Sequence, residues 1–191
     1  DFAIRSLPHR NSFFLVGSDY VWPRTAAKLA RAHLEERGMQ IVAEVYIPLN
    51  QTDTSAVAAS VFAKLPDGGV ILNTINGDGN VIFFPALSAA LMTSSGLTRD
   101  QVAAKWPVMS LSIGEAEADL IGPAHTKDHY VAWNYLQSLS TPENLEFIKV
   151  VRGYWGTSKL LLTDPMAMAA TNVALWKLAV ERAASFKAES I

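Results

Sequence analysis

The sequence predicts an α/β fold: a mostly parallel sheet with helices on both faces, three layers in all, followed by two C-terminal helices. Short runs rich in Val, Ile and Leu alternate with helical patterns, which is typical of parallel sheets joined by right-handed crossovers. The run at 70–72 shows no polar alternation, which indicates a strand buried on both faces. Beyond Ser138 the alternation stops, and Pro142 and Pro165 mark the starts of two successive helices.

The strands can be placed by their β-branched residues and by the turn residues beside them. We expect strands at residues 13–17, 40–47, from 70 onward, 106–113 and 129–133, with a weaker candidate at 159–162. Gly17 ends the first run and Pro48 ends the second, while Gly68 and Gly69 form a turn before the third.

Helices are predicted between the strands from caps and from apolar residues on one face. Pro23 suits a first helical turn, and Gly38 ends that helix. Thr52 or Asp53 caps the next helix, which runs to about Leu65. Further helices are expected at 80–95, at 97–105 as a short polar turn, from 141 and from 164. The apolar face of the last helix comprises Ala169, Val173, Trp176 and Val180.

Composition limits the classes of function. A chain of 191 residues, half of them hydrophobic, is long enough for one domain with a substantial core. The net charge is only −2 and the 16 basic residues are scattered, so nucleic acid is not an expected partner. No apolar run reaches about 18 residues, so we expect no membrane insertion. The absence of cysteine excludes disulfides and thiolate sites, and the start at Asp1 indicates a processed or truncated product.

The stretch 70–81 is where we expect a binding site. Its apolar run stops in a cluster of small polar residues: Thr74, Asn76, Gly77, Asp78 and Asn80. In open parallel sheets, ligands sit at the carboxyl ends of the strands, so these side chains are placed to hold a small polar molecule. The alternative is an ordinary turn, in which Asn, Gly and Asp serve the backbone geometry.

Motifs of enzymes and metalloproteins are weak in this chain. His125 and His129 lie four residues apart beside Asp128, but Pro123 argues against the helix that a metal-binding pair of this spacing needs. There is no Gly-x-Ser-x-Gly elbow and no phosphate-binding glycine loop. We therefore expect no metal, no cofactor and no catalytic residue.

Six segments in register resemble one protein family, the urea and short-chain amide binding proteins. They are GSDYVWPR at 17–24, YIPL at 46–49 with TD at 52–53, NTINGDGN at 73–80, SLSIGEAE at 110–117, AWNYLQS at 132–138 and TPE at 141–143. Each is short, but together they run in order over almost the whole chain. The family includes the solute receptors of urea ABC transporters and the amide sensor that controls aliphatic amidase expression.

The resemblance implies the type I periplasmic binding fold, in which two α/β lobes joined by hinge strands close over a small ligand. Residues 1–137 would form the second lobe, with a hinge strand at 133–138. Residues 138–191 would be helices of the first lobe without its sheet, so we expect them to pack unusually or to mediate self-association. By the same resemblance, the chain is a periplasmic fragment that captures urea or a short-chain amide for an ABC transporter permease.

The resemblance also implies ligand contacts in the loops after the first, third and fourth strands. A planar amide needs several acceptors and one or two donors in its site. The candidate ligand residues are Asp19, Tyr20, Trp22, Thr74, Asn76, Asp78, Ser112 and Glu115. The structural alternatives are rim packing for Trp22, helix capping for Asp19 and Asp78, and first-turn acids for Glu115 and Glu117.

Three other functions stay open from the sequence. The first is a cytoplasmic amide sensor that regulates amidase expression, which an encoded signal peptide would exclude. The second is a receptor for branched-chain amino acids. The third is a free-standing hydrolase, which predicts release of ammonia from urea or acetamide.

Overall fold

The structure is a computed structural model that describes residues 1–7 and 11–190. These residues form two compact units, residues 1–113 with 117–133, and residues 114–116 with 134–191. The first unit holds the sheet, and the second holds the two C-terminal helices. The polar lead-in expected before the first strand falls partly at 8–10, outside the described residues; before these lies a short helix, which the sequence did not predict.

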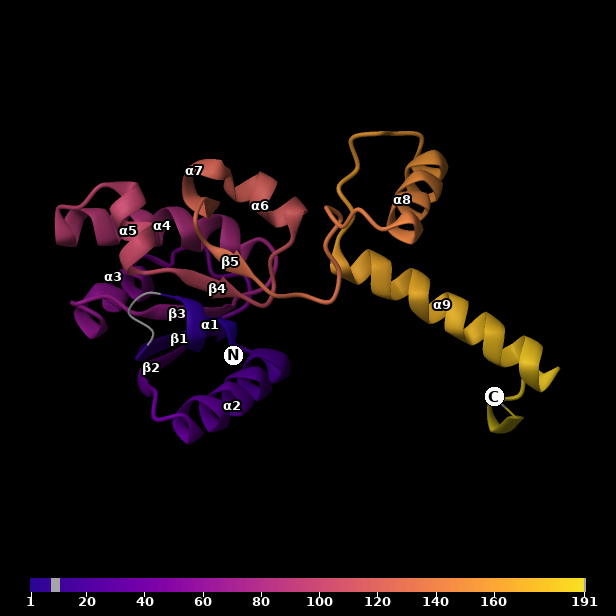
Figure 1. The fold of residues 1–191 in the computed structure, drawn as a ribbon, viewed down its shortest axis with the longest axis horizontal. Coiled ribbons are helices and arrows are strands. Elements are labelled where there is room, and N and C mark those ends of the chain that lie inside the picture. Colours follow the sequence, from indigo (N-terminus) through magenta and orange to yellow (C-terminus); the bar gives the residue numbers. More distant parts are fainter. Residues whose placement is uncertain (8–10, 191) are drawn as a thin grey trace. The chain divides into compact units, whose positions relative to one another are not determined.

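The first unit is built on a five-stranded sheet (Figure 1). Its strands are β1 (Ser12–Ser18), β2 (Gln40–Ile47), β3 (Val70–Thr74), β4 (Val108–Ser110) and β5 (Tyr130–Val131). Their order is β2-β1-β3-β4-β5, and every neighbouring pair is parallel, which confirms the predicted sheet. Because the chain leaves β1 for one edge and then crosses to β3 on the other side, the carboxyl ends of β1 and β3 flank a topological switch point.

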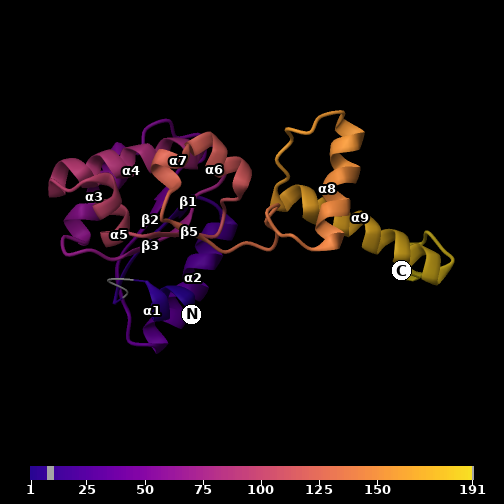
Figure 2. The same cartoon turned by 45° about the horizontal axis from the view of Figure 1, so that its top comes forward.

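Helices cover both faces of this sheet and complete the three predicted layers (Figures 1 and 2). One face carries α1 (Phe2–Ser6) and α2 (Val21–Glu36); the other carries α3 (Ser55–Lys64), α4 (Gly79–Ser95), α5 (Arg99–Lys105), α6 (Glu115–Ile121) and α7 (Pro123–Thr126). Side chains of α1 and α2 share a core with Phe13 and Leu15, whereas those of α3 to α6 share one with Phe14 and Val16. Neighbouring residues of β1 therefore serve opposite faces, as the strand pleat requires.

The fourth strand is shorter than the predicted 106–113. Trp106 precedes it and is fully buried, with its indole N–H donating to the main-chain oxygen of Leu65 at 2.8 Å. After Ser110 the chain leaves the ladder, and the hydroxyl of Ser112 donates to the main-chain oxygen of Ile75 at 2.6 Å. Main-chain bonds from Ile71 to Pro107 and from Leu111 to Asn73 close the two ends of the strand, and side-chain bonds to neighbouring loops lie beyond them.

Two predicted strands are not formed within the described residues. At 159–162 the backbone is irregular, and the N–H of Leu162 donates to Oε1 of Gln137 at 2.7 Å. The expected hinge strand at 133–138 is also irregular, and the main-chain oxygens of Gln137 and Leu139 accept hydrogen bonds from the amide of Asn144. In both segments, side chains bond the main-chain groups that a neighbouring strand would otherwise bond.

The second unit consists mainly of α8 (Pro142–Trp155) and α9 (Asp164–Ala183), followed by the 3-10 turn Ala188–Ser190. Both helices start with a proline in the first turn, as predicted, and Oγ1 of Thr141 accepts the N–H of Asn144 at 3.3 Å. The apolar face predicted for α9 is largely uncovered, since Val173 is 66% exposed and Trp176 is 53% exposed. Self-association through this face stays a prediction, which sedimentation velocity tests.

Within the described residues, no single helix has both the length and the apolar composition needed to cross a membrane. Helices α4 and α5 meet these two criteria only as a pair, and the pair is bent by 97°.

Candidate functional site

A cavity of about 300 Å³ opens at the carboxyl ends of β1, β2 and β3. It lies at the topological switch point, where open α/β sheets bind ligands. The loops after these strands and the start of α4 supply its lining: Ser18, Ile47, Pro48, Leu49, Asn50, Gln51, Thr52, Ile75, Asn76, Asp78, Gly79 and Ile82. We call it the switch-point cavity; its volume is at the lower end of the range for small-molecule pockets.

A buried network of polar side chains holds the loop between β3 and α4. Asn73 is fully buried and donates its amide to Oδ1 of Asn80 and to Oγ of Ser110, both at 2.8 Å. Its own Oδ1 accepts the N–H of Ile75 at 2.9 Å, a contact typical of Asn in turns. The amide of Asn80 donates back to the main-chain oxygen of Ile75 at 2.6 Å. For Asn73 and Asn80, the structure supports the turn interpretation of this stretch.

Two hydrogen bonds join the loop after β3 to the loop after β1. The N–H of Asn76 donates to Oγ of Ser18 at 3.0 Å, and its side-chain amide donates to the hydroxyl of Tyr20. The two strands approach closely at Gly17, where a Cβ atom would lie 2.4 Å from Oγ1 of Thr74. Glycine is therefore needed at this position to bring the two loops together.

The loop after β2 forms a third wall of the switch-point cavity. Asn50 has a φ of 67°, a left-handed conformation that Asn tolerates better than most residues. The main-chain N–H of Gln51 donates to the main-chain oxygen of Pro48 at 3.2 Å. The side-chain amide of Gln51 donates to the main-chain oxygen of Asp53 at 2.9 Å. The carboxylate of Asp53 accepts the N–H of Ser55 at the start of α3. These bonds fold the loop into a compact turn that borders the cavity.

The lining mixes polar side chains with apolar ones such as Ile47, Leu49 and Ile82, and Asp78 is the one ionisable side chain among its described residues. The nearby Arg24 is not part of it, because its guanidinium binds the carboxylate of Asp19 at 2.7 Å and lies 4.1 Å from the ring centre of Tyr46. Burial and the hydrogen bond to Glu44 raise the pKa of Tyr46 to about 12, so this hydroxyl stays protonated at neutral pH. A cavity with acceptors and one negative charge suits a neutral or cationic ligand that carries N–H donors.

The histidine pair noted in the sequence does not form a metal site. A helix does begin at Pro123, contrary to expectation, because proline suits a first turn. It is only one turn long, so it contains His125 but ends before His129. The ring of His129 instead accepts the N–H of Val108 at 3.2 Å. Within the described part of the chain, no three His, Cys, Asp or Glu side chains gather as metal ligands.

Four of the eight predicted ligand residues lie in the loops after β3 and β4. Asn76 and Asp78 line the switch-point cavity. The hydroxyls of Thr74 and Ser112 are buried and donate to main-chain oxygens at 3.1 Å and 2.6 Å. Both hydroxyls are thus engaged in holding the strand ends together.

The other four predicted residues lie outside the lining. Asp19 forms an ion pair and caps no helix, and Tyr20 is joined to the lining through its hydroxyl. Trp22 is 40% exposed. Glu115 belongs to the second unit, where it accepts the N–H of Ser138 at 2.8 Å. Burial acts to raise the pKa of Glu115, but this hydrogen bond and others outweigh it and hold the pKa below its ordinary value.

Sequence reasoning missed the wall formed by the loop after β2. Leu49, Asn50 and Gln51 line the cavity, but the candidate residues came only from the loops after the first, third and fourth strands. A signal was present, because Pro48 ends the second strand and a helix cap follows within a few residues. A short polar loop at the carboxyl end of a parallel strand is a candidate wall of a binding site.

Comparison with known proteins gives one family. The whole chain, residues 1–191, matches the family described as periplasmic binding protein domain. Among solved structures, an amino acid ABC transporter substrate-binding protein from Pseudomonas fluorescens matches with a TM-score of 0.70 at 20% identity. That match covers 96% of this chain and 45% of the other.

Two further structures share the fold. An ABC transporter solute-binding protein from Rhodopseudomonas palustris, in complex with p-hydroxybenzoic acid, has a TM-score of 0.71 at 21% identity, covering 93% of this chain and 45% of its own. A branched-chain amino acid ABC transporter periplasmic ligand-binding protein from Burkholderia xenovorans has a TM-score of 0.66 at 18% identity, covering 93% and 43%. The chain spans less than half the length of each of these proteins.

Proposed function

Because this chain belongs to the periplasmic binding protein domain family, we propose that it is one lobe of a periplasmic solute-binding protein that delivers a small molecule to an ABC transporter permease. This function is supported by the solved structures of the same fold, which are described as solute-binding proteins of ABC transporters. The protein would bind the ligand by hydrogen bonds as the two lobes close about the hinge, and release it as they open, without a covalent step. It is therefore a binding protein and not an enzyme.

The proposed ligand is urea or a short-chain amide. The observation that carries this proposal is the lining of the switch-point cavity, where the amides of Asn50, Gln51 and Asn76 accompany the carboxylate of Asp78. Urea offers four N–H donors and one carbonyl acceptor, which such a mixture of acceptors and donors can satisfy. A carboxylate ligand, such as the p-hydroxybenzoic acid of the Rhodopseudomonas structure, would meet no cationic side chain among the described lining residues.

The isolated lobe should bind this ligand weakly. In a two-lobed protein, the opposite lobe adds contacts, and closure removes water from the ligand. A lobe that presents one wall only is expected to have a dissociation constant on the order of millimolar. The full-length parent protein should bind about a thousandfold more tightly, in the micromolar range or below.

NMR titration of the 191-residue chain with urea, acetamide, leucine and benzoate tests the proposal. Urea and acetamide should shift the side-chain amide signals of Asn76 and Gln51, while benzoate should not. Larger shifts with leucine would favour a branched-chain amino acid receptor, and ammonia release in the same tubes would favour a hydrolase. The proposed function would be contradicted if none of the four ligands shifted any NMR signal and if none released heat in a calorimetric titration of the full-length protein.

A further inference from the structure

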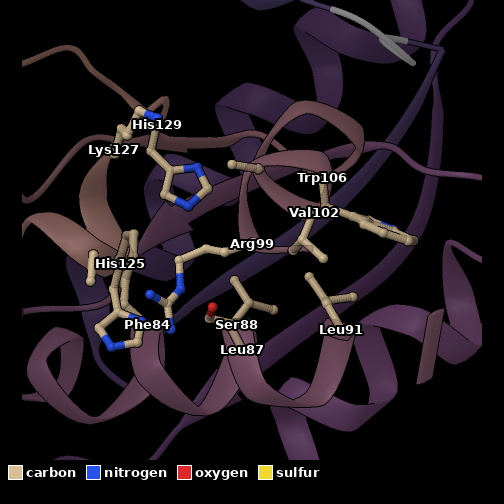
Figure 3. Close-up of a pocket in the computed structure, with 12 residues that line it drawn as sticks. Phe84, Leu87, Ser88, Leu91, Arg99, Val102, Trp106, His125, Lys127 and His129 are labelled. Carbon is tan, nitrogen blue, oxygen red and sulfur yellow. The ribbon is translucent and has the colours of Figure 1, made fainter. Parts of the chain in front are cut away.

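A second cavity of the first unit lies between α4, α5 and the segment that begins with α7 (Figure 3). Its volume is about 20 Å³, which is enough for one water-sized group. The lining comprises Phe84, Leu87, Ser88, Leu91, Arg99, Val102, Ala103, Trp106, Ala124, His125, Lys127 and His129. We call it the lateral cavity.

The ionisable side chains that line the lateral cavity are all basic. They are Arg99, His125, Lys127 and His129, and no acidic residue is among the described lining residues. The acids nearby are engaged elsewhere: the carboxylates of Asp100 and Asp128 lie 3.3 Å and 3.7 Å from the ammonium of Lys127. Lys127 is therefore neutralised outside the cavity.

Arg99 has no ion pair or hydrogen bond among the described residues. Its side chain starts at the first residue of α5 and reaches across the cavity towards Ser88, with His125 on the same side (Figure 3). Its charge is close enough to act on His125, because burial first and then the positive charge of Arg99 lower the pKa of that imidazole. An arginine that is free of partners and faces a cavity is available to bind an anion.

The Nδ1 atom of His125 is buried and has no hydrogen-bond partner among the described residues. Leaving a buried polar atom unpaired is unfavourable, so such atoms usually have a partner. His129 shows the contrast, since its Nδ1 accepts the N–H of Val108 and its ring packs edge-on against Phe84. Of the two imidazole rings that line the cavity, only that of His125 has a buried nitrogen without a hydrogen-bond partner among the described residues.

The floor of the lateral cavity is apolar. Phe84, Leu87 and Leu91 of α4 are almost completely buried, and Trp106 is fully buried. A floor of this kind excludes water, which strengthens any charge interaction made above it. The lateral cavity therefore suits one oxygen atom of an anion.

We propose that the lateral cavity binds a small carboxylate, with the guanidinium of Arg99 on its oxygens and the ring of His125 as the second partner. The volume admits one water-sized group, so the acid places one carboxylate oxygen inside and leaves its remaining atoms at the mouth, which suits formate, acetate or the end of an acidic side chain. An amide of the same shape lacks the charge that Arg99 requires. This site shares no lining residue with the switch-point cavity. A test of acetate binding here is therefore independent of the proposed function.

Sodium acetate is the probe, titrated into the 191-residue chain at constant ionic strength by replacement of sodium chloride. The ring signals of His125 should shift saturably in NMR spectra, while those of the exposed His33 should not. Acetamide, which has the shape of acetate without its charge, is the matched ligand control. Arg99→Gln should weaken acetate binding roughly fivefold, because a partly exposed charge pair is worth about 1 kcal/mol.

Lys64→Gln is the matched variant, since Lys64 is an exposed cation of α3 that does not line the cavity. Melting temperatures of both variants establish that they are folded. A free acid and an acidic side chain are distinguished by repeating the titration with a short peptide that contains one glutamate. The proposal is overturned if acetate gives no saturable shift of His125, if acetamide acts equally, or if Lys64→Gln weakens binding as much as Arg99→Gln.

Discussion

The two cavities of the first unit have opposite chemistry on the same sheet. The switch-point cavity is walled by loops at the strand ends, and Asp78 is the one ionisable group among its described lining residues. The lateral cavity is walled by α4, α5 and the segment that begins with α7, and its described ionisable residues are all basic. Only Arg99 and His125 of its basic residues belong to helices, since Lys127 and His129 follow α7. The two cavities therefore suit ligands of different charge.

Acid should sharpen this contrast at the largest cost in stability, because it adds positive charge to a buried wall of the lateral cavity. Burial lowers the pKa of His129 from its usual 6.5 to about 4. The unfolded chain therefore takes up this proton first as the pH falls, and the free energy of unfolding should drop by about 3 kcal/mol between pH 6.5 and pH 4. Guanidinium chloride unfolding across this range measures the drop.

The variant His129→Gln keeps an acceptor for the N–H of Val108 but does not titrate. It should lose most of the dependence between pH 6.5 and pH 4, whereas His33→Gln, which changes an exposed ring, should keep it. Equal pH profiles for the wild type and His129→Gln would show that groups other than His129 cause the acid sensitivity.

Asn73→Ala should damage the switch-point cavity and spare the lateral one. The substitution removes the buried amide that joins Asn80, Ser110 and Ile75, and leaves partners unpaired. We expect a loss of roughly 2–3 kcal/mol in the free energy of unfolding. The acetamide shifts should vanish while the acetate shift of His125 remains. Asn11→Ala, at an exposed position, should change neither; loss of both responses in Asn73→Ala would mean that the two cavities are not independent.

Asp78→Asn should change the charge of the switch-point cavity without unfolding it. The side chain of Asp78 is exposed and caps no helix by hydrogen bonding, so stability should change by less than about 0.5 kcal/mol. Binding of urea should weaken roughly threefold, because one charge-assisted hydrogen bond becomes neutral. NMR titration gives both values, with Asp67→Asn as an exposed control. An unchanged urea affinity would place the ligand away from this carboxylate.

The sheet was predictable because its signals are local. The apolar runs at 13–16 and 70–72 reflect contacts that every buried strand makes, and the structure places both where expected. The position of Asn76 and Asp78 beside the switch-point cavity was predictable for the same reason, since they follow a buried strand directly. A property that depends on one strand and its own loop can be inferred from the residues of that segment.

The partners of side chains were not predictable, because they depend on distant segments. Thr74 and Ser112 are polar residues at strand ends, but their hydroxyls donate to main-chain oxygens of neighbouring strands and loops. The lateral cavity is lined by residues of separate segments, including α4 and His125. The sequence of any one of these segments therefore does not predict the cavity. Such sites appear only when the elements are assembled in space.

The smallest expected effect in the comparison of the two cavities is that of Gln51. This residue belongs to the loop after β2, the wall of the switch-point cavity that the sequence did not predict. Gln51→Ala removes an exposed hydrogen bond to the main-chain oxygen of Asp53, so stability should change by less than about 0.5 kcal/mol. Urea binding should weaken about twofold as the turn loosens, while acetate binding at His125 should not change. Gln40→Ala, at the opposite end of β2, is the matched control. Equal effects of the two variants would exclude the loop after β2 from the ligand site, and the contrast between the two cavities would then rest on the loops after β1 and β3 alone.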